Sequence, residues 1–268
     1  MMKSKKNINK LLTTKHGLML CNKNDEYVGQ ALIRYGEYSE EEVMLFDTLC
    51  KDADTVIEVG ANFGSHTLAL SKMVGEKGKV IAFEPQRVVF QTLCANICLN
   101  NLTNVFCFQK AVSSKKSKLF LPPINYKKQG NFGGVSMQNR GVEEVEVIKL
   151  DKLLDIKQLK LIKIDAEGME LEVLKSAKKT IKKFLPFLYV ENDRFDKHEK
   201  LVSYIDALGY ILYWHITPLY NKNNFFKKKK NIFGALVSSN MLCIPKTLNI
   251  NPKNFKRVNI KDKHPLDY

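Results

Sequence analysis

Several features are missing from this 268-residue sequence. It has no apolar run of the roughly eighteen residues that a membrane-spanning helix needs, and its opening residues MMKSKKNINK lack the apolar stretch of a secretory signal. Its six cysteines form no CxxC pair and have no histidine partner at metal-site spacing. We therefore expect a soluble, non-exported protein with free thiols in the reducing cytoplasm. The 44% of hydrophobic residues is enough for a full-sized core, which excludes a disordered chain.

The net charge of +15 suggests nucleic-acid binding, so its place along the chain matters. Residues 1–10 carry four lysines and no acid, and residues 221–268 carry eleven basic and two acidic residues, whereas residues 11–220 hold 28 basic and 26 acidic ones. Lysine supplies 38 of the 43 basic residues, and it lacks the fork with which arginine reads guanine or grips phosphate. We expect a solvated surface or a general attraction to polyanions. The lysine run 227–230 is predicted to be a solvated loop.

Short apolar runs alternate with helical periodicity along most of the chain. The capping-box pattern of Ser39 and Glu42 predicts a helix start at that point. The alternation indicates an α/β fold with a parallel sheet and helices on both faces, and ligands of such sheets bind at the carboxyl ends of the strands. Strands are predicted at residues 55–59, 79–83, 105–108, 161–164, 187–190, 210–214 and 241–244, and helices at 65–73, 88–99, 170–177 and 197–208.

The first two strand ends predict a nucleoside-containing cofactor. The first strand runs into Gly60 and Gly64, and the second ends in Glu84. A carboxylate at this second position can accept hydrogen bonds from both hydroxyls of a ribose. A dinucleotide site has a glycine where this sequence has Asn62, so the turn favours a cofactor without a pyrophosphate, such as S-adenosylmethionine (AdoMet). The alternative is an ordinary tight turn beside a surface acid.

Four separated motifs stand at or near predicted strand ends, namely VIEVGANFGSHT at 56–67, FEP at 83–85, IKIDAEG at 162–168 and YVE at 189–191. Together they resemble the FkbM family of AdoMet-dependent methyltransferases, and the similarity extends over about residues 35–215. The resemblance implies a class I methyltransferase fold, which is a Rossmann-like, doubly wound seven-stranded sheet with the order 3-2-1-4-5-7-6 and the last strand antiparallel. It also implies O-methylation, typically of a sugar or glycan hydroxyl or of a polyketide-like small molecule.

The resemblance also suggests how the chain is divided. We expect an N-terminal arm at 1–38, a methyltransferase domain at 39–246 and a basic C-terminal tail at 247–268. Residues 113–141 interrupt the domain as an irregular insertion, and long loops in compact domains are usually functional or disordered. The arm, the insertion and the tail match none of the motifs, so we expect them to select the acceptor.

The glycine turn, the second strand end and the resemblance together predict the cofactor site. The expected contacts come from the ends of successive strands and from the turn between the first strand and its helix. They are Glu58, Gly60, Asn62, Phe63, Gly64, Ser65, Glu84, Pro85, Ala111 and Asp165.

Two later strand ends carry polar groups with three possible uses. Asp165, Glu191 and Asn192 offer hard oxygen ligands suited to Mg²⁺ or a similar ion, and they resemble the Asp, then Asp-Asn pattern of cation-dependent catechol-type O-methyltransferases. Without a metal, Asp165 or Glu191 would be the general base that accepts the hydroxyl proton. In the third alternative, Asp165 and Glu167 only cap the helix that follows.

Two further side chains are candidates for catalysis. Lys163 lies two residues before Asp165, so both point to the same face of the strand, where the lysine can shift the pKa of an acid or pair with Glu167 or Glu191. His215 ends the 210–214 strand and is placed for substrate.

Three functions fit these observations to different degrees. The leading hypothesis is an AdoMet-dependent O-methyltransferase that acts on a small-molecule or glycan acceptor, with catalysis mainly by positioning. The second is a nucleic-acid methyltransferase that uses the basic tail, although the fourth strand ends in DAEG and not in the Asn/Asp-Pro-Pro-aromatic run of amino-methylating enzymes. The third is a non-catalytic polyanion-binding module, and the presence of Glu58, Asn62 and Glu84 together argues against a degenerate site.

Overall fold

The computed structural model describes residues 7–115, 118–153, 156–260 and 263–267. The lysine-rich opening of the expected arm, residues 1–6, lies outside this part of the chain. Among the described residues no helix has the length and apolar character needed to cross a membrane.

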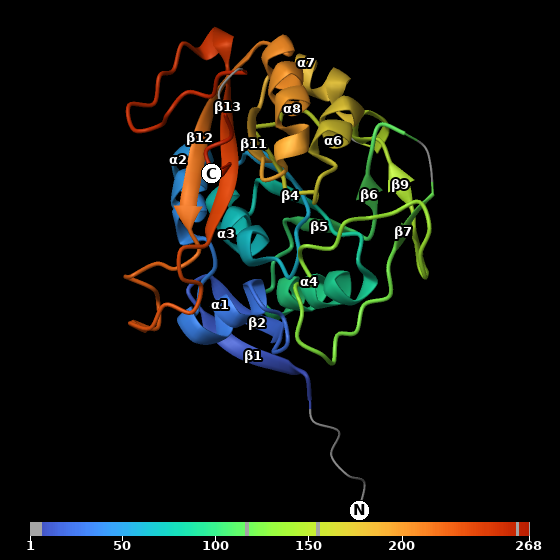
Figure 1. Ribbon diagram of the computed structural model, residues 1–268, viewed down its shortest axis with the longest axis vertical. Coiled ribbons are helices and arrows are strands. Elements are labelled where there is room, and N and C mark those ends of the chain that lie inside the picture. The colour runs from blue at the N-terminus through green and yellow to red at the C-terminus, as the bar shows by residue number, and fades with distance from the viewer. Residues whose placement is uncertain (1–6, 116–117, 154–155, 261–262, 268) are drawn as a thin grey trace, which may run out of the picture.

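A seven-stranded sheet forms the centre of the molecule (Figure 1). Its spatial order is β12-β13-β11-β10-β3-β4-β5, and only the pairings of β13 with β11 and β12 are antiparallel. Numbered along the chain, these strands have the order 3-2-1-4-5-7-6, so the fold class implied by the resemblance is confirmed. The strands are β3 (Thr55–Val59), β4 (Lys79–Phe83), β5 (Val105–Phe108), β10 (Leu161–Ile164), β11 (Phe187–Glu191), β12 (Tyr210–Pro218) and β13 (Val237–Pro245).

The central strands are buried on both faces, which explains their continuous apolar sequences. Ile57 and its neighbours on alternate positions pack against α5 to α8, whereas Val56 and Val80 pack against α2 and α3 on the opposite face. The helices are α1 (Val28–Tyr35), α2 (Glu40–Leu49), α3 (Ser65–Val74), α4 (Arg87–Leu99), α5 (Leu150–Leu153), α6 (Glu170–Ser176), α7 (Lys178–Phe184) and α8 (Phe195–Ala207), with a short 3-10 helix η1 (Lys246–Leu248).

The helix predicted from the capping box exists, but the box itself does not form. Ser39 has a left-handed backbone with φ 46° and makes no side-chain cap bond at the start of α2. Glu42, the expected second member of the box, is buried and its Oε1 accepts a hydrogen bond from Asn240 Nδ2 at 3.2 Å. Tertiary contacts with β13 thus outweigh the local capping pattern.

The N-terminal arm folds as the hairpin β1 (Asn9–Thr14) and β2 (Gly17–Asn22) followed by α1, and it lies against α4 (Figure 1). Asn96 of α4 is fully buried, and its side-chain amide bonds the backbone of the hairpin as a neighbouring strand would. Its Oδ1 accepts from the Leu20 amide at 2.6 Å, and its Nδ2 donates to the carbonyl oxygens of Leu20 at 3.0 Å and Phe63 at 2.8 Å. Asn100, one turn later, repeats the pairing with the backbone of Leu18. The side chains of one helix therefore fix the arm to the turn after β3.

The 113–141 insertion crosses the carboxyl edge of the sheet and is tied to the arm. Buried Asp25 accepts the amides of Gly29 at 2.7 Å and Phe132 at 3.1 Å, and the Gly130 amide donates to the Asn24 carbonyl at 3.0 Å. The small strands around the insertion are β6 (Ala111–Val112), β7 (Leu119–Leu121), β8 (Glu143–Val145) and β9 (Val147–Ile148), which form two two-stranded sheets beside the main one.

The described part of the tail packs against β12. The amide of Trp214 donates to the Lys256 carbonyl, and that of Val258 donates to the Leu212 carbonyl, both at 2.8 Å. His264 is buried against the Trp214 ring, with ring centroids 5.0 Å apart. The tail thus extends the edge of the sheet.

We predict that Asn96→Ala lowers the free energy of unfolding by about 2–4 kcal/mol, because buried backbone groups of the arm and the turn lose their partners. The matched control is Asn100→Ala, where water can replace the side chain at a more exposed position, and we expect a loss below about 1 kcal/mol. Urea denaturation measures both values. Equal losses in the two variants would contradict the prediction.

Candidate active site

A cavity of about 410 Å³ lies at the carboxyl ends of the central strands. Among the described residues that line it, Arg194 is the one cation. The acidic lining residues come from β11 and from the loops after β4, β10 and β11, and they are Glu84, Asp165, Glu167, Glu191 and Asp193.

The glycine turn after β3 is joined to the acid after β4 by hydrogen bonds. Glu84 Oε2 accepts from the Asn62 amide at 3.0 Å, and its Oε1 accepts from the Gln86 amide at 2.8 Å. Burial raises the pKa of Glu84 to about 7, although both backbone amides favour its charged form. Each carboxylate oxygen keeps a further lone pair, so the group can accept two more hydrogen bonds. Gly60 has φ +83°, and a side chain there would overlap the carbonyl oxygen of Asp165.

A second, narrow cavity adjoins the first and shares Gly60, Glu84 and Asp165 with it. Its other walls are largely apolar side chains from the end of β4, from β6 and from the insertion, namely Pro85, Val112, Val135 and Met137, with Ala111 beside them. The apolar lining is of the kind that packs against an aromatic ring.

Of the predicted cofactor contacts, Gly60, Asn62, Glu84 and Asp165 line the main cavity, and Pro85 and Ala111 line the narrow one. The other four predicted contacts line neither cavity. Glu58 is 1% exposed, accepts the Thr67 hydroxyl at 2.6 Å and lies beneath the turn. The remaining three build the turn itself and are Phe63, Gly64 and Ser65.

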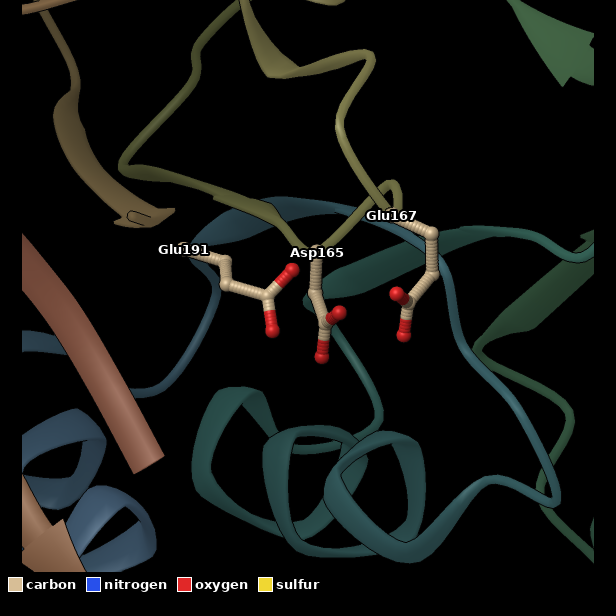
Figure 2. A group of neighbouring side chains, drawn as sticks. All are labelled: Asp165, Glu167 and Glu191. Atoms are coloured by element: carbon tan, nitrogen blue, oxygen red, sulfur yellow. The ribbon is translucent and has the colours of Figure 1, made fainter. Parts of the chain in front are cut away.

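Three carboxyl groups converge above β10 and β11. Asp165, Glu167 and Glu191 offer oxygen atoms that all lie within 4.8 Å of one another, and Figure 2 shows the three groups side by side. Burial raises the pKa of Glu191 well above its ordinary value, and the neighbouring charges of Asp165 and Glu167 raise it further. Burial and Asp165 likewise raise the pKa of Glu167. The cluster therefore retains protons that separate carboxyl groups would release.

The predicted metal trio does not assemble. The side chain of Asn192 is buried away from the cavity, where its Nδ2 lies 2.8 Å from His198 Nδ1 and 3.2 Å from Met241 Sδ. Asn192 follows Glu191 directly, so strand alternation directs the two side chains to opposite faces. Glu167 occupies the third position beside Asp165 and Glu191, whereas the sequence suggested it as a helix cap or as a partner of Lys163.

The capping alternative is also wrong. The turn before α6 is held by Glu170, whose Oε1 accepts the amides of Ala166 at 3.2 Å and Gly168 at 2.8 Å. Asp165 and Glu167 make no cap bond at the start of α6. Their carboxylates face the cavity, so they are available for chemistry.

Lys163 lies beneath the cavity floor and does not line it. The side chain is buried, and its Nζ lies 3.2 Å from Asp165 Oδ2 and 3.9 Å from Glu58 Oε1. Burial opposes its charge, but the carboxylates of Asp165, Glu58 and Glu42 together raise the pKa of Lys163 above its ordinary value. Lys163 is therefore a positioning cation for Asp165, and its predicted direct catalytic role is corrected. The expected partners Glu167 and Glu191 are replaced by Glu58.

His215 lies outside the cavity as well. Its Nδ1 is 2.8 Å from the Tyr189 hydroxyl, and its ring packs against Phe255 of the tail. Burial lowers the pKa of His215 to about 4, so the ring is neutral near pH 7. The predicted catalytic role of His215 is thus not supported, because His215 lies within β12 and its ring faces Tyr189 and Phe255 on the α2 side of the sheet.

The remaining wall of the cavity comes from segments without motifs. Tyr27 and Val28 at the start of α1 line it together with Tyr38, and Leu236 and Ser238 contribute from the connection into β13. Sequence reasoning missed these residues, because nothing in their spacing indicates contact with the sheet edge. The insertion lines the cavity as expected, through Asn131, Gly133 and Gly134.

The strand order and the acid-lined cavity at the strand ends define a class I methyltransferase fold. The crystal structure of precorrin-6y C5,15-methyltransferase from Geobacter metallireducens GS-15 has the same fold, with a TM-score of 0.51 and 12% identity over 76% of this chain and 87% of that one. Residues 58–212 match the Methyltransferase FkbM domain, and the chain belongs to this family.

Two curated relatives are methyltransferases. Methyltransferase sdnD from Sordaria araneosa is 26% identical over 156 residues, which cover 45% of this chain and 59% of that protein. Methyltransferase 1 from Beauveria bassiana (strain ARSEF 2860) is 26% identical over 146 residues, which cover 46% of this chain and 58% of that protein. The chain thus spans less than two thirds of the length of either relative.

We predict that Lys163→Met destabilises the protein by about 3–5 kcal/mol at pH 8, because it leaves buried carboxylates without their cation. Burial already raises the pKa of Glu58 to about 7, and loss of the lysine raises it further. A folded state that binds more protons than the unfolded state loses stability as pH rises, so the loss at pH 6 is expected to be smaller.

Urea denaturation at pH 6 and pH 8 checks this prediction. The control is Lys175→Met, since Lys175 pairs with Glu172 at the surface and contributes less than about 1 kcal/mol. The prediction is wrong if Lys163→Met lowers the free energy of unfolding no more than the control does, or by the same amount at both pH values. Either result would mean that Lys163 does not stabilise the buried carboxylates.

Proposed function

We propose that the chain is an AdoMet-dependent O-methyltransferase that acts on a hydroxyl of a sugar, a glycan or a related polyol. The observation that carries the proposal is one cavity in which Glu84 faces the same space as Asp165 and Glu191. A carboxylate suited to a ribose and two carboxylates suited to accept a proton thus share one chamber. Bound AdoMet supplies a methyl group made reactive by its positively charged sulfonium.

The donor side of the cavity fits a nucleoside. Glu84 is held in position by two backbone amides and can accept the two hydroxyls of a ribose. The narrow cavity beside it, with Pro85 and Met137 among its walls, suits the base. Because Gly60 has no side chain, the turn after β3 lies directly against the Asp165 backbone. The cavity in front of the turn is thereby left open for the remainder of the cofactor. The acidic lining favours a cationic sulfonium over a pyrophosphate.

The acidic lining also limits the acceptor. Arg194 is paired with Glu167 at 2.8 Å and with Asp193 at 3.3 Å, so its charge is already compensated. A phosphate backbone would be repelled here, whereas the hydroxyls of a neutral polyol can donate to the carboxylates. Tyr27 and Tyr38 add aromatic walls, which suit the face of a sugar ring. A neutral polyol is therefore favoured over nucleic acid.

We propose that the Asp165 and Glu191 pair accepts the hydroxyl proton during methyl transfer. Both carboxylates line the cavity, and the raised pKa of Glu191 makes its ionised form a stronger base than an exposed glutamate. Lys163 holds Asp165 in place from beneath the floor. The main contribution of the chain is the orientation of the hydroxyl toward the methyl group.

A divalent cation is the competing explanation of the acidic cluster. Asn192 is unavailable as a ligand, and both Asp165 and Glu167 already have a cationic partner, Lys163 and Arg194 respectively. We therefore propose proton acceptance without a metal.

The setting of the reaction is proposed to be the cytoplasm. All six cysteines are free thiols, and such thiols persist in a reducing compartment.

We predict that Glu84→Gln weakens binding of S-adenosylhomocysteine at least about tenfold, because an amide cannot accept hydrogen bonds on both of its ends. The affinity of the unmodified protein is expected to rise with pH through about 7 as Glu84 ionises. Isothermal titration calorimetry at pH 6 and pH 8 measures both effects. The control is Glu146→Gln, at an exposed surface pair with Lys110, which should bind like the wild type. Unchanged affinity in Glu84→Gln would exclude the proposed ribose contact.

We predict that Asp165→Asn and Glu191→Gln each lower kcat about 10²-fold or more, because each removes a member of the proton-accepting pair. The wild-type rate should rise with pH, since the base must be ionised and its pKa is raised. A methyl-donor assay against a panel of sugars and glycan extracts, with and without a chelator, measures the rates.

The matched control is Asp196→Asn, an exposed acid in the first turn of α8, which should retain the wild-type rate. Loss of activity with the chelator and recovery with Mg²⁺ would show that the acids bind a metal and would overturn the metal-free mechanism.

A further inference from the structure

A separate cavity of about 430 Å³ lies on the outer side of the N-terminal arm. It is formed between α1 and the lysine run 227–230. Three cations line it, namely Arg34, Lys228 and Lys230, together with apolar surface from Ile33, Tyr35 and Ile232. Among the described residues that line this cavity there is no acidic side chain. We call it the basic cavity.

The lysine run 227–230 is an exposed loop, as its composition predicts, but its backbone is anchored. Its carbonyl oxygens are held by tyrosine hydroxyls, because Tyr35 donates to Lys230 at 2.9 Å and the Tyr220 hydroxyl lies 3.0 Å from the Lys228 oxygen. Asn224, itself buried, bonds both the amide and the carbonyl of Lys228, at 2.9 and 2.8 Å. The backbone of the run is thus fixed in one conformation.

The layer beneath the run anchors it to α1. Tyr35 is buried and packs against Phe233, with ring centroids 5.9 Å apart, and its hydroxyl also accepts the Ile232 amide at 2.8 Å. Buried Glu37 accepts the Phe225 amide at 2.9 Å with one oxygen, so the nearest buried acid is engaged with backbone. All four lysines of the run are exposed, Lys228 and Lys230 line the basic cavity, and no ion pair among the described residues offsets their repulsion.

The cations that line the basic cavity repel one another, and a compact anion bound among them would reduce this repulsion. Arg34 can offer a fork of N–H donors to two oxygens, and the lysine ammonium groups can meet the remaining oxygens as point charges. A phosphoryl group presents this arrangement of oxygens in a small volume. We propose that the basic cavity binds a phosphoryl group of a small molecule, at a site distinct from the methyl-transfer cavity.

The two cavities share one helix. Val28 lines the methyl-transfer cavity and Arg34 lines the basic cavity, and six residues of α-helix rise about 9 Å. The two sites also differ in charge, since one is lined by acids and the other by bases. A phosphorylated compound can therefore occupy the basic cavity without placing its phosphate among the carboxylates.

Calorimetric titration with inorganic pyrophosphate at about 0.15 M KCl tests the proposal. We expect saturable binding to the full-length protein, weakened at least about tenfold in Arg34→Gln and in the double variant Lys228→Gln/Lys230→Gln. The matched control is Lys182→Gln/Lys183→Gln, which removes two exposed charges from α7 and should bind like the wild type. S-adenosylhomocysteine binding, measured on the same samples, reports on the proposed function separately and shows that the variants are folded.

Absence of saturable pyrophosphate binding, or equal weakening in the α7 control, would overturn the proposal. Phosphatidylglycerol vesicles that displace pyrophosphate would identify a lipid headgroup as the source of the phosphate, whereas vesicles without effect would indicate a soluble compound. Binding of a short RNA without any binding of pyrophosphate would show a nucleic-acid surface instead and would also overturn the proposal.

Discussion

The carboxyl groups at the carboxyl ends of the central strands depend on the buried positive charge of Lys163. It lies in the middle of β10, between Asp165 and Glu58, and the strands on either side leave it no access to water. An unpaired charge in this place would cost several kcal/mol, so the carboxylates around it are required for folding as well as for chemistry. In turn the lysine ammonium lies 3.2 Å from Asp165 Oδ2, in the carboxyl group that faces Glu167 and Glu191. Stability and the proposed catalysis thus share one ion network.

The rest of the cavity is built by segments that close over this edge. The arm is held by Asn96, the insertion is held by Asp25, and the connection between β12 and β13 is held by Tyr35. Each anchor is a buried polar side chain that bonds backbone, which fixes position more firmly than apolar contact alone. In the proposed function, the strand ends of the sheet supply the donor side, while these added segments supply the acceptor side. A family fold can therefore accept different substrates without change to its sheet.

The donor side could be predicted from the sequence, because strand periodicity and the GxxxG turn are local signals. The positions of Gly60, Asn62 and Glu84 follow from them, and the resemblance supplied the strand order. The proposed acceptor side could not be predicted in this way, because only tertiary packing brings Tyr38 and Ser238 to the same cavity. Asn192 was misplaced because an isolated strand end does not reveal which face its last side chain occupies. The lysine run is the exposed loop that its composition predicts, but composition does not show the tyrosines that hold its backbone.

The central claim is that one chamber holds the nucleoside of AdoMet at Glu84 and the reacting oxygen at Asp165 and Glu191. A crystal structure of the protein with S-adenosylhomocysteine tests it most directly. We expect both ribose hydroxyls within hydrogen-bond distance of the Glu84 carboxylate, the base beside Pro85 and Met137, and the sulfur facing the carboxyl cluster. A ligand bound elsewhere, or one whose ribose does not contact Glu84, would contradict the account.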